Sequence, residues 1–275
     1  MTRKTKKILF YVAVVIFIIS SFFITLYAQG YKYSLKDGKF YLTGAISVKL
    51  NTDAKVYLND ELEGSTSFFG ASFGIDRLLP GEYALSTIRD NYSTWKKIVT
   101  VQEGLVSDFG HILILPISGD GKDQIILEIE NLFTAAYPTP TKSPTPRPGA
   151  TRTPSPSPTP NLDPYILMGD KLFYNTPTEL TQIGSSVAGF KFSENNKKIM
   201  WWTNNEVWVR WLTDTDYQPF MKKDQTELIT RFSKPISSAL WFRGNDHIVV
   251  KMAGANEAYK ILEIDKRGSV NIIDY

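Results

Sequence analysis

The sequence predicts a mainly β protein that follows an N-terminal transmembrane helix, and three observations lead to this expectation. An apolar stretch without any charged residue runs from Ile8 to Ala28. Between Thr43 and Pro116, short runs rich in Val, Ile, Tyr and Leu alternate with turn-forming clusters, which gives a strand about every 8–12 residues. A Pro-rich segment then leads to residues 165–275, where five of the six tryptophans predict a second folded part.

These observations divide the chain into five expected segments. They are a cytoplasmic tail (1–7), a transmembrane anchor (8–28), a β-sandwich with its flanking segments (29–136), a disordered linker rich in Pro, Thr and Ser (137–164), and a β-repeat domain (165–275). A length of 275 residues suits two modest domains, since domains typically hold about 100–200 residues.

The composition excludes several kinds of site. The chain has no cysteine, so disulfides, thiolate metal sites and cysteine nucleophiles are excluded. The net charge of +3 is small, and no basic helix or platform of aromatic residues and arginine accompanies it. Nucleic acid is therefore not an expected partner.

The apolar stretch is long enough to cross a membrane. As a helix it would span about 30 Å, the thickness of the hydrocarbon core of a bilayer. A signal peptide cleaved after Ala28 is the alternative, but the stretch exceeds the usual ~7–15 apolar residues and Leu26 is larger than the small residue preferred there. We therefore expect an uncleaved, single-pass anchor in the cell membrane. Four basic residues favour a cytoplasmic N-terminus, with the bulk of the chain on the other side; they are Arg3, Lys4, Lys6 and Lys7.

The segment from Gln29 to Gly38 has two compatible interpretations. Its tyrosines, Tyr31 and Tyr33, together with Tyr27 suit the headgroup level of a membrane. The same segment is also typical of a first strand that ends in a turn at Lys36-Asp37-Gly38.

Turn and core residues can be assigned between Thr43 and Pro116. Asn59-Asp60 predicts a tight hairpin between Lys55–Leu58 and Glu61–Glu63. Asp90-Asn91 predicts a second turn, because Asn91 tolerates a left-handed backbone better than most residues other than glycine. Phe68, Phe69 and Phe73 are candidate core residues, and Tyr83, Tyr92 and Trp95 are expected to fill the core or its lid rather than to bind sugar.

Four motifs of this region together resemble a PEGA domain. They are Ala54–Asn59 (Ala-x-Val-Tyr-Leu-Asn), Gly64–Thr66 (Gly-x-Thr), Leu78–Tyr83 (Leu-x-Pro-Gly-Glu-Tyr) and Tyr92–Val101 (Tyr-x-x-Trp-x-x-x-Val-x-Val). The resemblance extends roughly from Gly44 to Pro116, a quarter of the chain. It implies a small β-sandwich of surface and envelope proteins, which serves as a binding or spacing module without a catalytic set.

Two different segments follow. Residues 119–123 contain aspartates but lack the ligand spacing of a calcium loop, so a turn is expected there. Gln124–Phe133 is either a last strand or a short helix. The helix is favoured because it would place four apolar residues on one face, namely Ile125, Ile126, Ile129 and Phe133.

Ten of the 15 prolines lie between Pro138 and Pro164. Such a stretch cannot bury enough apolar surface to fold, so an extended linker is expected, which would reach on the order of 80 Å at ~3.1 Å per residue. Recognition by SH3-type grooves is the alternative. The dense Thr and Ser residues are also potential acceptors of O-glycans.

Residues 165–275 contain an internal repeat. Phe190–Trp201 recurs as Leu240–Lys251, with a period of about 50 residues that is typical of propeller blades. The clearest motif is Phe192–Ile199 (Phe-Ser-x-x-x-Lys-Lys-Ile), with which the segment resembles WD40-like or TolB-type propeller repeats. About two repeats fit, whereas closed propellers typically have about 4–8 blades. The resemblance therefore implies an incomplete propeller-like domain, and a truncated chain, a ring completed between chains and a small open β domain all remain as interpretations.

The tryptophans of this segment are the candidates for recognition. Trp202, Trp208 and Arg210 would share one face of a strand pair by their even spacing, where they would stack on a sugar or a peptide. The density of aromatic residues suits such stacking, but an aromatic β core is the competing and favoured interpretation.

No catalytic residue, cofactor or metal ligand is predicted. The two histidines, His111 and His247, show no metal-binding spacing, and no Gly-x-Ser-x-Gly nucleophile motif is present. The expected function is non-catalytic binding or scaffolding in a bacterial cell envelope, with the bilayer and a cell-wall glycan or envelope protein as partners. A periplasmic sensor or assembly protein that binds another protein through its distal domain is the alternative, and a glycan-processing enzyme is a third.

Overall fold

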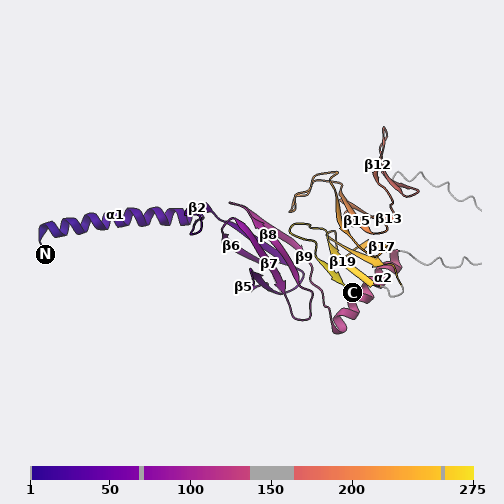
Figure 1. The fold of residues 1–275 in the computed structure, drawn as a ribbon, viewed down its shortest axis with the longest axis horizontal. Helices are drawn as coiled ribbons and strands as arrows, with labels where there is room; N and C mark the ends of the chain where they lie inside the picture. The colour runs from indigo at the N-terminus through magenta and orange to yellow at the C-terminus, as the bar shows by residue number, and fades with distance from the viewer. Residues whose placement is uncertain (1, 68–70, 137–163, 255–257) are drawn as a thin grey trace, which may run out of the picture. The chain divides into compact units, whose positions relative to one another are not determined.

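The computed structural model describes residues 2–67, 71–136, 164–254 and 258–275 (Figure 1). These residues are mainly β and follow an N-terminal apolar helix, which confirms the predicted fold class at this level. They form two compact units, one that extends to Ile114 and includes 267–269, and one that comprises 115–266 and 270–275. The predicted linker, 137–164, lies outside the described residues apart from Pro164, as do Phe68 and Phe69.

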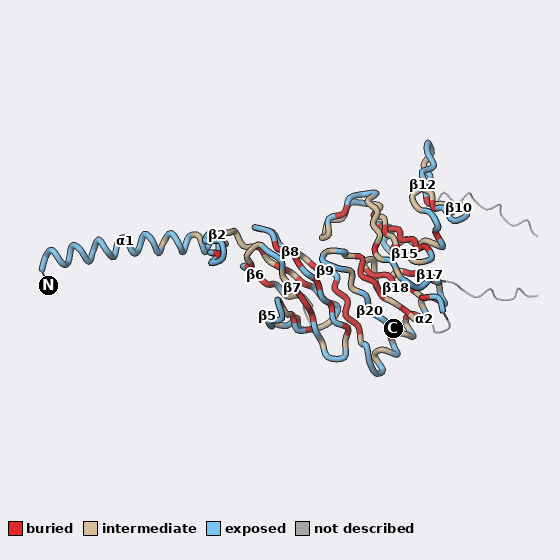
Figure 2. Tube along the Cα trace, in the orientation of Figure 1, coloured by how far each residue is buried: buried red, intermediate tan, exposed pale blue. Residues whose placement is uncertain are grey.

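Helix α1 (Arg3–Ala28) contains the whole predicted apolar stretch. It begins at Arg3 because the Thr2 hydroxyl accepts a hydrogen bond from the backbone N–H of Thr5 and caps the first turn. None of its residues is buried, and Figure 2 shows it exposed along almost its whole length. The helix is long and apolar enough to span a membrane or to serve as a signal anchor.

A two-stranded hairpin follows the helix. It consists of β1 (Tyr31–Ser34) and β2 (Lys39–Leu42), which pair antiparallel. The turn between them contains Gly38 with a φ of 67°, so the strand and turn predicted after Gln29 are both present.

Two sheets share one hydrophobic core in the first unit. Their strand orders are β6-β3-β9 and β5-β4-β7-β8. Strands β3 and β9 run parallel, and the other paired strands of these two sheets run antiparallel. The strands are β3 (Gly44–Leu50), β4 (Lys55–Leu58), β5 (Glu61–Ser65), β6 (Ser72–Leu78), β7 (Gly81–Ile88), β8 (Trp95–Val101) and β9 (Val106–Ile112).

Aromatic residues contribute to this core, as predicted. Trp95 is buried and packs edge-on against Phe109, with 5.4 Å between the ring centroids. Phe73, Tyr83 and Tyr92 are partly buried against the same core.

The predicted turns of the first unit are also present. Asn59 and Asp60 connect β4 to β5 with φ values of 51° and 66°, the left-handed conformation of a two-residue hairpin turn. In the predicted turn at Asp90-Asn91, Asn91 has a φ of 62° and uses the left-handed conformation that it tolerates. Asparagine and aspartate tolerate this conformation because their short polar side chains form local hydrogen bonds.

Among the described residues, the second unit has three antiparallel sheets, each with its strands in chain order (Figure 1). The first sheet comprises β10 (Tyr165–Met168), β11 (Lys171–Asn175) and β12 (Leu180–Gly184). The middle sheet comprises β13 (Gly189–Phe192), β14 (Lys198–Trp202), β15 (Glu206–Trp211) and β16 (Thr226–Arg231). The third sheet comprises β17 (Ile236–Trp241), β18 (His247–Met252), β19 (Ala258–Glu263) and β20 (Ile272–Asp274).

The middle sheet is packed on both faces. Met200 and Trp202 of β14 belong to a hydrophobic cluster shared with the third sheet. Ile199 and Trp201 belong to a second cluster shared with the first sheet. Every residue of β14 is consequently buried.

Helix α2 (Gly119–Ala136) packs in the second unit, and Gln124–Phe133 is helical, as the favoured interpretation of that segment predicted. The turn predicted for residues 119–123 is wrong, because these residues form the start of the helix. Its buried residues are Ile125, Ile129 and Phe133, and Phe133 stacks on Tyr259 of β19 with 5.8 Å between the ring centroids. The predicted segment 29–136 grouped this helix with the first β domain. The structure places it with the second because its apolar face is buried there.

The repeat differs by one residue from the predicted alignment, which matched Phe190 to Leu240. The last strand pairs before the two turns are Phe192 with Ile199 and Trp241 with Ile248, so Phe192 corresponds to Trp241. Similarity of the turn residues suggested the other alignment, but strand pairing determines which residues are equivalent.

Replacing Phe133 with alanine should destabilise the second unit by about 3 kcal/mol, because the change removes a buried aromatic side chain and leaves a cavity beside Tyr259. Leu127→Ala is the matched control on the same helix, because Leu127 is 57% exposed. Denaturant unfolding of the full-length protein in detergent, followed by tryptophan fluorescence, measures both. Equal unfolding midpoints for the two variants would contradict the packing of α2.

Candidate functional site

The three predicted ligand-binding residues do not share one face of the middle sheet. Trp208 and Arg210 lie two residues apart on β15 and therefore point to the same side. Trp208 pairs with Trp201, whereas Trp202 pairs with Val207, and directly paired residues lie on the same face. Trp202 thus points to the opposite side, where it is 4% exposed in the core. Spacing along the chain was misleading here because the turn between β14 and β15 sets the register.

Trp208 is half-buried and firmly held. Its ring stacks on that of Trp201 with 6.1 Å between the centroids and an interplanar angle of 1°. Its indole Nε1 donates a hydrogen bond of 2.9 Å to Glu206 Oε2. Glu206 Oε1 in turn accepts a hydrogen bond of 2.8 Å from Nε of Arg231. Trp208 also packs against the cluster shared with the first sheet, so only part of its ring is exposed. These contacts fix the orientation of the ring, and its exposed part is preorganised for a ligand.

The charge of Glu206 is stabilised by its neighbours. The hydrogen bonds from Trp208 and Arg231 hold the pKa of the Glu206 carboxyl below its ordinary value, and partial burial opposes them more weakly. Glu206 is therefore an anionic hydrogen-bond acceptor throughout the neutral pH range.

Arg210 is largely engaged within the protein. Its Nη2 donates to Asp224 Oδ1 at 2.9 Å, and its Nη1 donates to Thr226 Oγ1 at 3.4 Å. The guanidinium also lies beside Tyr165, whose pKa is raised chiefly by burial while Arg210 opposes this rise. Its Nε is buried without a hydrogen-bond partner among the described residues. These intramolecular contacts neither support nor contradict direct binding by Arg210, so that role stays a prediction.

Trp208, Glu206 and Arg231 therefore form a candidate binding surface, which we name the Trp208 surface. It offers a partly exposed indole ring, a carboxylate and a guanidinium that is 68% exposed. Such a set can stack on an apolar ring face and exchange hydrogen bonds with polar groups at the ring edge. Glu206 and Arg231 were not predicted as site residues from the sequence. Glu206 could have been found from its position two residues before Trp208, but Arg231 depends on the pairing of β15 with β16.

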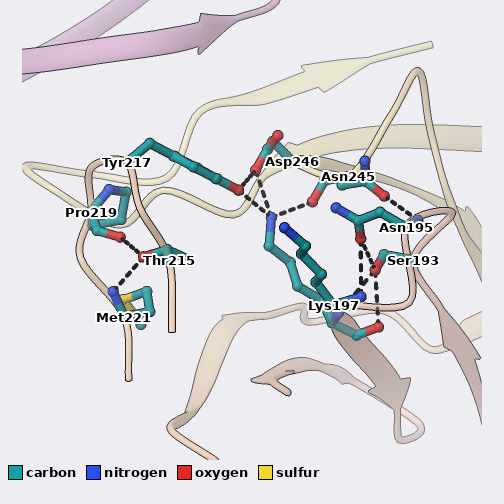
Figure 3. A network of polar contacts seen from close by, with 10 residues as sticks. Ser193, Asn195, Lys197, Thr215, Tyr217, Pro219, Met221, Asn245 and Asp246 are labelled. Atoms are coloured by element: carbon teal, nitrogen blue, oxygen red, sulfur yellow. Dashed lines mark hydrogen bonds and ion pairs between the residues drawn. The ribbon is translucent and has the colours of Figure 1, made fainter. Parts of the chain in front are cut away.

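A second polar cluster surrounds Lys198, the first residue of β14 (Figure 3). Its Nζ donates to Tyr217 Oη at 2.9 Å, to the Asn245 carbonyl at 2.7 Å and to Asp246 Oδ1 at 2.7 Å. Tyr217 Oη also donates to Asp246 Oδ1 at 3.0 Å. The cluster joins the β17–β18 turn to the middle sheet and to the loop between β15 and β16.

The turn that precedes Lys198 is organised by side chains of its own. Ser193 Oγ accepts from the backbone N–H of Lys198 at 2.9 Å, and Asn195 Oδ1 accepts from that of Lys197 at 3.0 Å. The backbone N–H of Asn195 donates to Asn245 Oδ1 at 3.1 Å, which links the two corresponding turns of the middle and third sheets (Figure 3).

The environment of Lys198 suits a structural role. Burial lowers the pKa of its ammonium, while Asp246 opposes this shift. Burial and the neighbouring Asp246 raise the pKa of Tyr217. A lysine with a lowered pKa can act as a base or nucleophile, but this side chain is only 2% exposed and its three protons are directed at three oxygens. The ion pair is therefore closed to a substrate.

The histidines are not brought into a metal site. His111 is exposed on β9 in the first unit, and His247 is buried at the start of β18 in the second. Within the described part of the chain, no group of three or more His, Cys, Asp or Glu residues is placed to hold a metal ion.

Comparison with known proteins adds no family assignment, because neither a family model nor a curated protein matches the chain.

Replacing Lys198 with methionine should destabilise the second unit by about 3 kcal/mol, because it removes the cation that compensates the partly buried Asp246. Lys222→Met is the matched control. Lys222 pairs with Asp214 at the surface, where the two side chains are 80% and 57% exposed, so the loss should be about 0–1 kcal/mol. Urea unfolding of both variants measures the difference. Equal losses in free energy of unfolding for the two variants would show that the buried ion pair stabilises the protein no more than the exposed one.

The stabilisation contributed by Glu206 should depend on pH. Its pKa is lowered in the folded protein, so the contribution is present above the ordinary value of 4.5 and is lost as the pH falls through the lower, folded value. The difference in free energy of unfolding between the parent and Glu206→Gln should therefore be constant from pH 6 to 8, and shrink below about pH 4.5. Urea unfolding at a series of pH values tests this. A difference that stays unchanged down to pH 3 would refute the assignment of the low pKa to Glu206.

Proposed function

We propose that this protein is a single-pass membrane protein of a bacterial cell envelope, with its N-terminus in the cytoplasm and both β units on the outer side. It binds a cell-wall glycan without catalysing a reaction, and the Trp208 surface is its binding site. The first unit acts as a PEGA-like spacer near the membrane, and the second as an incomplete propeller-like binding domain.

Helix α1 is the observation that carries the anchoring part of this proposal. It exposes apolar side chains in every direction, and no residue of it is buried by the first unit. Phe10, Phe17 and Ile24, for example, are each more than half exposed. A continuous apolar surface of this kind would be strongly unfavourable in water. A bilayer would cover them all, and the basic residues before the helix favour the cytoplasmic side for its start.

Two features of the fold support the spacer and binding roles. The two sheets around one core in the first unit suit a small β-sandwich, as the PEGA resemblance implies. The three successive sheets of the second unit, each with its strands in chain order, suit the blades of an incomplete propeller.

The chemistry of the Trp208 surface supports recognition. Glu206 is held ionised by two donors, whereas a general acid would need a pKa raised toward neutrality. The ring of Trp208 is supported from behind by Trp201, and its edge is bordered by groups that hydrogen bond well to hydroxyls. Sugars present both an apolar ring face and hydroxyl groups, so a glycan fits these features.

Co-sedimentation of the full-length protein in nanodiscs with purified cell-wall material tests the binding role. Trp208→Ala should weaken binding on the order of tenfold, the loss expected for a central aromatic contact. Phe220→Ala is the control, because Phe220 is an exposed aromatic residue of the same unit, 68% exposed in the loop after β15. Unfolding midpoints of both variants establish that they are folded.

Failure of the folded parent to sediment with the wall would overturn the glycan proposal. An equal loss of binding in both variants would exclude the Trp208 surface as the site. Binding to an envelope protein through the second unit would then be the function to test.

A further inference from the structure

The hairpin β1–β2 folds back beside the apolar helix. Phe40 of β2 lies against Phe23 of α1, with 6.0 Å between the ring centroids, and Tyr33 lies against Phe40 at 5.1 Å. Phe23 precedes the helix end at Ala28 by five residues, which is about 7.5 Å along the axis at 1.5 Å per residue. The end of the hairpin therefore lies at the depth of the apolar helix and not beyond its end.

The position of the hairpin is fixed by its base. The backbone N–H and the hydroxyl of Thr43 both donate to the carbonyl of Gly30, at 2.9 and 2.7 Å. Gly30 has a φ of 88°, which allows the sharp turn from the helix into β1. On the other side, the guanidinium of Arg77 on β6 lies over the ring of Tyr27, 4.2 Å from its centroid. The hairpin is thus connected both to the helix end and to the first unit.

The hairpin has an apolar face and an apolar tip. Tyr33 and Phe40 pair directly and share one face, and they are 47% and 39% exposed. Leu35 at the tip is 92% exposed. The tip is held in shape by Ser34, whose hydroxyl donates to Asp37 Oδ2 at 3.0 Å and whose carbonyl accepts from the N–H of Gly38 at 2.9 Å. An ordered turn with an almost fully exposed leucine beside Tyr33 and Phe40 suits an apolar surrounding.

The charge of the hairpin is positive. Lys32, Lys36 and Lys39 are all exposed, and Asp37 is the one acidic residue among 29–42. The ammonium of Lys32 also donates to the carbonyl of Arg77 at 3.4 Å, which leaves its other protons for a headgroup. Lysines near the boundary of a membrane extend their ammonium groups toward phosphate while their methylene chains stay in the apolar layer. Each basic residue near an anionic membrane surface adds favourable binding free energy.

We propose that the β1–β2 hairpin is a lipid-binding element, which inserts Leu35, Tyr33 and Phe40 into the outer leaflet and binds anionic headgroups through its three lysines. This inference rests on the proposed membrane anchoring by α1. It adds a second attachment to the anchor, so that the first unit is held against the membrane surface instead of rotating freely about a single helix.

A fluorescent probe on a single cysteine tests this insertion, because the natural chain has no cysteine. The full-length protein carrying Leu35→Cys with an environment-sensitive NBD label is reconstituted into phosphatidylcholine vesicles, with or without phosphatidylglycerol. A spin-labelled lipid with its nitroxide close to the headgroup should quench the probe on Leu35→Cys several-fold more than the same probe on Asp60→Cys. Asp60 is the matched control, because it is an exposed turn residue of the same unit.

A third site separates the two proposals. Ile18→Cys lies in the middle of the apolar helix and should be quenched by a lipid with its nitroxide deep in the acyl chain. If the probe at Ile18 is quenched but the probe at Leu35 is quenched no more than the one at Asp60, the hairpin proposal alone is overturned. Absence of quenching at Ile18 would overturn the anchor, and the hairpin proposal with it.

The lysines are tested in the same vesicles. Phosphatidylglycerol should increase the quenching of the Leu35 probe, and the triple change Lys32→Gln, Lys36→Gln and Lys39→Gln should abolish that increase. Equal quenching with and without phosphatidylglycerol in the labelled Leu35→Cys protein, with its three lysines intact, would refute the binding of anionic headgroups.

Discussion

The second unit depends on the burial of one strand from both sides. Strand β14 (Lys-Ile-Met-Trp-Trp) has no exposed residue, so the sheet that contains it needs a neighbouring layer on each face. The first and third sheets supply these layers, and α2 packs on the third. This arrangement also buries the ammonium of Lys198 at the start of the strand. Its desolvation is compensated by Asp246, Tyr217 and a backbone carbonyl.

The sequence predicted features that local chemistry decides. The apolar helix, the Asn59-Asp60 hairpin turn and the left-handed Asn91 each follow from a few adjacent residues, and the structure contains all three. Features that depend on strand register or on contacts between distant segments were missed. The face of Trp202 follows from its partner Val207, and the neighbours of α2 depend on Tyr259, which is far away in the chain.

The same distinction applies to the candidate site. Trp208 was identified as a candidate because an aromatic residue on a strand is visible in the sequence. Its surroundings were not predictable, because Trp201 reaches it through the β14–β15 register and Arg231 reaches Glu206 through β16. The PEGA and propeller resemblances stay predictions.

The central claim is that α1 crosses a membrane and leaves both β units outside the cytoplasm. Single cysteines at Thr2 and Lys222, labelled with a membrane-impermeant maleimide in right-side-out and inverted membrane vesicles, test it most directly; Lys222 is 80% exposed in the second unit. We expect Lys222→Cys to be labelled in right-side-out vesicles and Thr2→Cys only in inverted ones. Labelling of Lys222→Cys only in inverted vesicles, or loss of Thr2 from the mature protein by cleavage, would contradict it.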